Sequence, residues 1–203
     1  MSDLRNRRLT ATDSVGLFAG GVYFVGELAE RLSLLVVEAV TPDGGISATV
    51  TGPGEVRVSF AADAYRQYRA PVLARQLESL ATALWVRYRR RYLEIVSSWT
   101  DRDDEPDATD DDREFQRRLG DLQVVGVSTG GRVTVRSRAL VSWHVEIGEE
   151  PVGSLTESEF VAELSGAIVA LLADHRAKVI LLTDAVYDIG LPRSMRTAGQ
   201  GVP

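Results

Sequence analysis

Arginines gather in one short stretch of the chain, and arginine is the side chain best suited to hold a phosphate group. A guanidinium group donates two parallel hydrogen bonds to phosphate oxygens. Phosphate contacts supply most of the affinity of proteins that bind DNA without regard to its sequence. The stretch therefore predicts a surface that binds double-stranded DNA. Its six candidate side chains are Arg69, Arg75, Arg87, Arg89, Arg90 and Arg91.

A structural interpretation of the same arginines competes with the DNA hypothesis. Four arginines near the C-terminus of a helix also solvate its outer face and complement the negative end of the helix dipole. At about 100° per residue, positions 87 to 91 spread around much of the helix circumference instead of forming one stripe, which favours the structural interpretation. Arg132, Arg136 and Arg138 alternate along a predicted strand and share one face. For these three the structural interpretation is again favoured.

No group of residues in the sequence has the spacing of a catalytic or metal site. The chain contains two histidines and no cysteine, which excludes disulfides, thiol catalysis and zinc–thiolate sites. His175 falls among the apolar positions of a predicted helix and is expected to be structural and partly buried. His144 alternates with Trp143 and Val145 and is expected to face solvent. No Ser-His-Asp or metal-ligand spacing links the histidines, so we predict a non-enzymatic protein without a cofactor or metal.

The elements that must position these side chains occur twice. In the first copy, Gly44-Gly45 precedes two short β-prone runs and a long amphipathic helix, and the same order follows Gly130-Gly131 in the second copy. The glycine pairs are 86 residues apart, and the ends of the two hairpins are 87 apart. A unit repeated at this length indicates two similar modules that pack on each other.

Each copy is predicted to be a three-stranded antiparallel meander followed by one long helix. Apolar and β-branched runs bounded by Gly, Pro and Asp predict the strands, and apolar residues at three- and four-residue steps predict the helices. The first copy has strands at 34–40, 46–51 and 56–60 and a helix from Pro71 to 99. The second has a short helix at 114–119, strands at 122–127, 132–137 and 141–147, and a last helix that starts at a Thr156–Glu159 capping box.

The net charge of −6 belongs to one segment. Residues 101–114 hold nine acidic residues and two arginines, so the rest of the chain is nearly neutral and the acidity does not exclude DNA. This composition predicts an extended spacer, because it cannot bury enough apolar surface to offset its ordering entropy. A mimic of DNA that competes for a basic surface is the alternative. The uncharged run at 15–26 is shorter than the ~20 residues of a membrane span, which favours a cytoplasmic protein.

We accordingly predict an α+β protein whose two modules associate into an internal pseudo-dimer. The first module is placed at 13–100, an acidic linker at 101–112, the second module at 113–190 and a loose tail at 191–203. Within the first module, a helix capped by Asp13-Ser14 and a hairpin that turns at Gly20-Gly21 both fit the stretch before the first strand.

This order of elements, with the run GGISATVTGPGEVRVSF at 44–60, resembles the YbaB/EbfC family of small bacterial nucleoid-associated proteins. The hallmark of that family is a glycine-rich turn, a strand, a tight G-x-G-E turn, a second strand and a long helix. The second copy keeps Gly130 and Gly131 but has 137–140 in place of the G-x-G-E turn, and the two matches cover about 28–188. The positions of the first copy that match the pattern are Gly44, Gly45, Gly52, Gly54, Glu55 and Val56.

The resemblance implies DNA binding, because members of the family are homodimers that bind DNA, and two fused copies would build such a dimer within one chain. It favours a sequence-tolerant protein of the cytoplasm and nucleoid, with double-stranded DNA as its partner, no membrane association and room for further homodimerisation. The alternative is a protein-interaction or chaperone-like module that binds no DNA, since actinobacterial relatives are tied to specialised secretion systems. The first copy holds the arginines, so any binding surface is expected mainly there.

Overall fold

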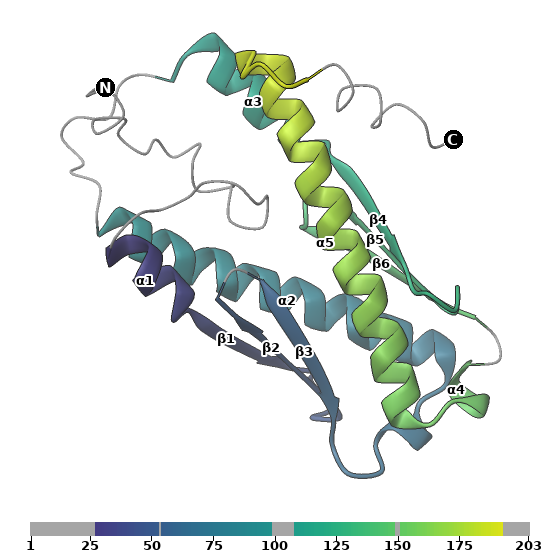
Figure 1. Cartoon of the computed structure of the whole chain (residues 1–203). Helices are drawn as coiled ribbons and strands as arrows, with labels where there is room; N and C mark the ends of the chain where they lie inside the picture. Colours follow the sequence, from purple (N-terminus) through teal and green to yellow (C-terminus); the bar gives the residue numbers. More distant parts are fainter. Residues whose placement is uncertain (1–26, 53, 99–107, 149–150, 193–203) are drawn as a thin grey trace.

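The computed structural model describes residues 27–52, 54–98, 108–148 and 151–192 (Figure 1). The basic N-terminal arm, the predicted cap and glycine turn before residue 27, most of the acidic linker and the C-terminal tail lie outside these described residues.

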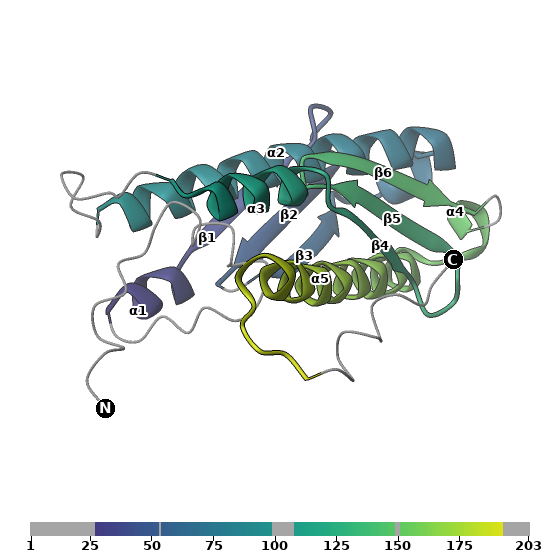
Figure 2. The same cartoon turned by 90° about the horizontal axis from the view of Figure 1, so that it is seen from above.

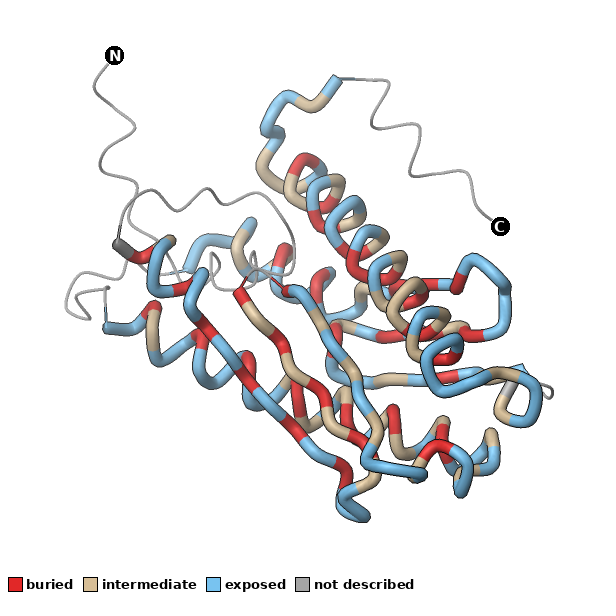
Figure 3. The backbone as a smooth tube through the Cα atoms, turned by 60° about the horizontal axis from the view of Figure 1, so that its bottom comes forward, coloured by how far each residue is buried: buried red, intermediate tan, exposed pale blue. Residues whose placement is uncertain are grey.

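The first module contains the predicted meander and long helix. Alternate residues of its strands are buried against the helices, as the period of two in the sequence requires (Figure 3). Helix α2 starts at Ala70, with Pro71 in the first turn, where its missing N–H removes no helical hydrogen bond. The elements are α1 (Glu27–Ser33), β1 (Val36–Val40), β2 (Ile46–Thr51), β3 (Glu55–Phe60), the short 3₁₀ helix η2 (Tyr65–Gln67) and α2 (Ala70–Ser97).

The second module repeats this order. Its first helix is longer than the predicted 114–119, because Thr109 caps it: the Thr109 Oγ1 accepts a hydrogen bond from the Asp112 N–H at 3.1 Å. The helix therefore begins within the stretch assigned to the acidic linker from the sequence. The elements are α3 (Asp110–Gly120), β4 (Gln123–Val127), β5 (Val133–Arg138), β6 (Ser142–Ile147), α4 (Pro151–Ser154) and α5 (Glu157–Tyr187).

Each sheet is an antiparallel meander, in the orders β1-β2-β3 and β4-β5-β6. Every strand of the second module, and the start of its long helix, lies 87 residues after its counterpart in the first. This spacing corrects the glycine alignment. Gly44, with a φ of 72°, corresponds to Gly131, with a φ of 67°, and not to Gly130. Both N–H groups close the same turn, onto the carbonyls of Thr41 and Ser128.

The two modules share a core. Helix α2 contacts β1 and β2 of its own module and β6 of the other, while α5 contacts β4 and β5 of its own module and β3 of the other. The strands run between the two long helices, which lie close at their N-terminal ends and diverge toward their C-terminal ends (Figures 1 and 2). Buried side chains of both modules form one continuous apolar cluster. These reciprocal contacts agree with the predicted internal pseudo-dimer, which stays a prediction.

Aromatic and charged side chains join the modules at two further places. The ring of Phe160 lies 6.1 Å from that of Phe60 and 5.3 Å from that of Tyr65, measured between centroids. On the other side, the Glu78 Oε1 of α2 accepts the Val145 N–H of β6 at 2.9 Å and lies 3.1 Å from the His144 Nδ1. Glu78 thereby accepts a backbone N–H from the edge of β6 that pairs with no other strand.

None of the helices in the described ranges has the length and apolarity to cross a membrane.

Candidate nucleic-acid interface and the neighbouring groove

Helix α2 positions the six arginines predicted from the sequence, but it divides them between its two ends. Arg69 is the residue that precedes the first turn, and Arg75 lies in the second turn. The other four lie at 87–91, more than three turns further along. All six side chains are exposed.

Most of the arginines in the C-terminal group are held by the protein itself. Arg90 and Arg91 both bind the Glu94 carboxylate, at 3.1 and 2.9 Å, and their hydrogen bonds lower the pKa of Glu94 below its ordinary value. The Arg87 Nη1 donates to the Glu38 carbonyl oxygen at 2.7 Å, on the open edge of β1. Arg87 therefore ties α2 to the sheet, as the structural interpretation expects. Arg89 has no hydrogen-bond or ion-pair partner within the described ranges.

The N-terminal end of α2 carries three arginines that have no partner among the described residues: Arg66, Arg69 and Arg75. We call them the arginine trio. Arg66 was not among the six arginines predicted from the sequence. In the structure it lies on η2, four residues before Ala70, the first residue of α2. The corresponding positions in the second module are Gly153, Thr156 and Ala162, so the trio belongs to the first module.

Arg69 of the trio lies where positive charge is unfavourable for the fold. The N-terminal end of a helix is the positive end of its dipole. The first turn of α2 has no acidic residue and no side-chain cap to offset it. The first turn of α5, in contrast, has a complete capping box from Thr156 and Glu159. Acidic residues of α5 lie near this end: burial, followed by Glu159 and Glu157, raises the pKa of Tyr65.

The arginines of the second-module sheet pair with acidic residues. They are partnered as Arg132 with Glu163, Arg136 with Glu146, and Arg138 with Asp121. The hydrogen bond that Arg136 donates to the Glu146 carboxylate raises the pKa of Arg136 above its ordinary value. The structural interpretation of these three arginines from the sequence agrees with this pairing.

The aromatic residues interleaved with the arginines belong to the core. Tyr88 and Tyr92 are each only 2% exposed, and the rings of Trp85, Tyr88 and Tyr92 form a stacked series with centroid spacings of 6.2 and 6.5 Å. Burial raises the pKa of Tyr88 to about 12. Tyr88 and Tyr92 are therefore not on the surface to stack on nucleotide bases.

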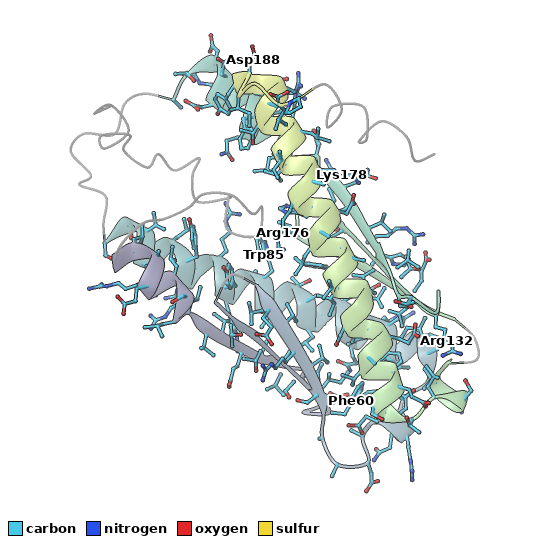
Figure 4. All side chains as sticks on the ribbon, in the orientation of Figure 1. Phe60, Trp85, Arg132, Arg176, Lys178 and Asp188 are labelled. Atoms are coloured by element: carbon cyan, nitrogen blue, oxygen red, sulfur yellow. The ribbon has the colours of Figure 1, made fainter. Side chains whose placement is uncertain are left out.

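A groove of about 400 Å³ lies between the C-terminal half of α2 and the second module. Apolar and aromatic side chains form most of its wall, and Arg89 and Arg138 add positive charge. In Figure 4, Trp85, one of its wall residues, lies between α2 and α5. The other wall residues used below are Tyr88, Leu93, Leu140 and Val141.

A second, smaller hollow of about 90 Å³ lies deeper, between the two modules. Its lining is apolar and comes from both sheets and both long helices. It shares Trp85, Tyr88 and Leu140 with the groove, and it also includes Ala81 and Trp143.

The histidines take structural roles. His175 is 2% exposed and occupies the position in α5 that corresponds to Tyr88 in α2. His144 is exposed, as expected, but it also contacts the carboxylates of Glu78 and Glu146. Across the described ranges, no three His, Asp or Glu side chains converge to hold a metal ion.

Comparisons of the chain with protein-family models, with characterised proteins and with solved structures find no match. The resemblance to the YbaB/EbfC family therefore rests on the sequence pattern alone, and membership of that family stays a prediction.

Proposed function

We propose that this protein binds double-stranded DNA without regard to sequence, through the phosphate contacts of Arg66, Arg69 and Arg75. The observation that carries the proposal is that all three guanidinium groups are exposed and without a partner in the described part of the chain. A guanidinium group that binds no acidic side chain has its N–H donors available for a phosphate.

Two features of the surrounding chain support this choice of surface. Residues 54–98 carry eight arginines against four acidic residues, whereas 151–192 carry two basic and six acidic residues. The positive charge of Arg69, directly before the first turn of α2, also costs the fold about 0.3–1 kcal/mol. A bound phosphate would relieve this repulsion.

The acidic first turn of α5 limits how DNA can approach. Because Glu157 and Glu159 lie close enough to Tyr65 to affect its titration, a duplex that covered this turn would meet like charge. The proposal therefore places the duplex on the α2 side of this end of the molecule.

The binding test is fluorescence anisotropy of a labelled random duplex at low salt, with a triple variant that replaces Arg66, Arg69 and Arg75 by Gln. We expect micromolar binding by the unaltered chain and a loss of at least tenfold in the variant. The matched control replaces three arginines that pair with acidic residues, and it removes the same charge. These are Arg113, Arg117 and Arg136, and the control is expected to keep its affinity within about threefold.

Two results would count against the proposal. If the unaltered protein does not bind duplex DNA at low salt, the DNA hypothesis is wrong, and the protein-interaction alternative becomes the leading one. If both triple variants weaken DNA binding equally, the affinity depends on the net charge of the protein and not on the trio.

A further inference from the structure

The groove and the smaller cavity have walls in common and differ in chemical character. The groove has a volume of about 400 Å³ and contains Arg89 and Arg138. The cavity has a volume of about 90 Å³ and is lined by apolar side chains. Trp85, Tyr88 and Leu140 belong to the walls of both. A molecule that occupied both would have charge near one end and hydrocarbon around the other.

The inner cavity is a place where the core is incompletely filled. Protein interiors are normally packed without voids of this size. The cavity also has Trp143 in its wall, and the buried Trp143 Nε1–H has no hydrogen-bond partner among the described residues. Buried polar atoms without partners are rare in native cores. Both features occur at the same junction between the modules. A hydrocarbon ligand would fill the void, although it would offer no acceptor to the Trp143 Nε1–H.

The outer groove supplies a cation that the fold leaves unused. Arg89 is exposed and has no partner within the described ranges, whereas Arg138 on the opposite wall binds Asp121. Leu93 and Val141 beside them are 41% and 52% exposed, which is high for apolar side chains in a recess. The groove therefore combines one available positive charge with apolar surface that is still in contact with water.

We propose that the groove and cavity bind a small amphiphile with a carboxylate head and a slim, unbranched hydrocarbon tail. The head binds Arg89, the middle of the tail covers Leu93 and Val141, and the end of the tail enters the cavity beside Trp143. This ligand site is independent of the arginine trio and of the DNA hypothesis.

The volumes of the cavity and the groove limit the size of the hydrocarbon tail that they can hold. A cavity of about 150 Å³ is known to hold benzene, and a water molecule takes up about 30 Å³. A hollow of about 90 Å³ has room for about three methylene-sized groups and is smaller than that benzene site. The groove lies within the range of about 300–1,000 Å³ that is usual for small-molecule sites. A carboxylate of about ten carbons fits the two together.

The test is isothermal titration of the full-length protein with decanoate, below the concentration at which it forms micelles. We expect saturable binding of one decanoate per chain. Decanol, which has the same tail without the charge, should bind about tenfold more weakly. Phenylbutyrate, which has the charge with a ring at the end of its tail, should also bind about tenfold more weakly.

Three variants locate the site. Ala81→Leu adds three carbon atoms to the cavity wall and is expected to abolish binding, while its circular dichroism and melting temperature show that it folds. Arg89→Gln should weaken decanoate about tenfold and leave decanol unchanged. Arg176→Gln is the matched control. Arg176 occupies the corresponding position in α5, is also exposed and without a described partner, and lies outside the groove. It should leave binding unchanged.

The proposal is overturned if decanoate shows no saturable binding, or if Ala81→Leu binds it as well as the unaltered protein. It is also overturned if Arg89→Gln and Arg176→Gln lower the affinity for decanoate equally, because the affinity would then depend only on the net charge of the protein. Saturable binding of an acidic, leucine-rich peptide together with no binding of decanoate would contradict it too, and would assign the groove to a protein partner.

Discussion

At the scale of single residues, what a guanidinium group already binds decides whether it is available to a phosphate. Arg90 and Arg91 share Glu94, and Arg87 holds a backbone carbonyl of β1. A phosphate would have to displace these contacts. The arginine trio has no such contacts within the described part of the chain. We therefore propose that DNA binds the trio and not the denser cluster at 87–91.

A second residue-scale feature, the contact between Asp43 and Tyr68, gives a pH prediction. The Tyr68 hydroxyl donates to the Asp43 Oδ2 at 2.7 Å. Burial, followed by this bond, raises the pKa of Tyr68 from 10.0 to about 12. The contribution of neutral Tyr68 to stability is therefore complete below pH 10 and is lost as the pH rises through about 12. Tyr68→Phe should be less stable than the unaltered protein at pH 9, and the difference should shrink between pH 10 and 12. Urea denaturation across this range measures it, and a difference that does not change with pH would refute the assignment.

Sequence patterns identified the arginines but not their partners. The spread of positions 87–91 around a helix already favoured the structural interpretation. That Arg87 reaches β1, however, depends on a residue 49 positions earlier. Arg66 was overlooked because its lack of a partner is a property of the folded chain. Tyr88 and Tyr92, which alternate with the arginines of 87–91 in the sequence, are buried because the apolar stripe of α2 passes through both positions.

At the scale of elements, the two long helices begin in opposite ways. The first turn of α5 has a capping box, whereas α2 begins at Arg69 without a side-chain cap. The Arg69 backbone is nevertheless extended, with φ −98° and ψ 149°, which is the conformation that a capping residue adopts. The missing cap therefore reflects the side chain at this position and not the path of the chain.

Arg69→Asp should consequently separate stability from DNA binding. An aspartate at this position can accept a helix N–H and opposes the dipole, so the free energy of unfolding should rise by about 1 kcal/mol. DNA affinity should fall in the same variant. Thr156→Ala, at the corresponding position of α5, should lower stability by about 1 kcal/mol and leave DNA affinity unchanged. Thermal denaturation and anisotropy together measure both quantities; a loss of stability in Arg69→Asp would contradict this view of the helix start.

The β-turns of the two modules diverge in sequence but not in conformation. Gly52 and Ala139 occupy corresponding positions with φ values of 51° and 54°. Their N–H groups donate to the Leu35 and Leu122 carbonyls, each at 2.8 Å. A left-handed conformation costs an alanine about 1 kcal/mol relative to glycine. The second module therefore keeps the turn despite losing its glycine.

Ala139→Gly should relieve this strain and raise the free energy of unfolding by about 0.5–1 kcal/mol. Gly52→Ala is the reciprocal change and should destabilise, because its new Cβ would also lie 3.1 Å from the Ser33 carbonyl oxygen. Urea denaturation of both variants is the measurement. A less stable Ala139→Gly would mean that the entropy lost on ordering a glycine exceeds the strain it relieves.

Local patterns predicted the elements well where one period dominates. The six strands and two long helices follow from apolar alternation and from three- and four-residue steps, and their ends differ by at most two residues from those expected. The start of α3 was missed because its first turn is made of aspartates, which the composition assigned to a linker. Thr109 provides the cap that makes those aspartates a favourable helix start.

At the scale of the whole molecule, each long helix covers part of the other module's sheet. This arrangement joins the modules through a common core and creates the cavity between them. We expect one cooperative unfolding transition, since neither module buries its apolar face alone.

Glu78 tests this coupling, because its carboxylate holds the Val145 N–H of the other module at 2.9 Å. Glu78→Ala should lower the free energy of unfolding by about 1–2 kcal/mol, and Glu78→Gln, which keeps an acceptor, by less. Glu94→Ala on the same helix removes only exposed ion pairs and should cost under about 0.5 kcal/mol. Urea denaturation ranks the three variants. Equal losses for Glu78→Ala and Glu94→Ala would show that the contact between the modules contributes no more than a surface ion pair.

DNA phosphates are proposed to bind three arginines of the first module that have no partner among the described residues. The number of these contacts can be measured from the dependence of duplex affinity on salt concentration, compared between the unaltered protein and the variant with Arg66, Arg69 and Arg75 replaced by Gln. Each phosphate contact contributes about −0.9 to the slope of log affinity against log salt. We therefore predict that the slope of the variant is shallower by about 2.7. An unchanged slope, or no binding by the unaltered protein at low salt, would contradict the account.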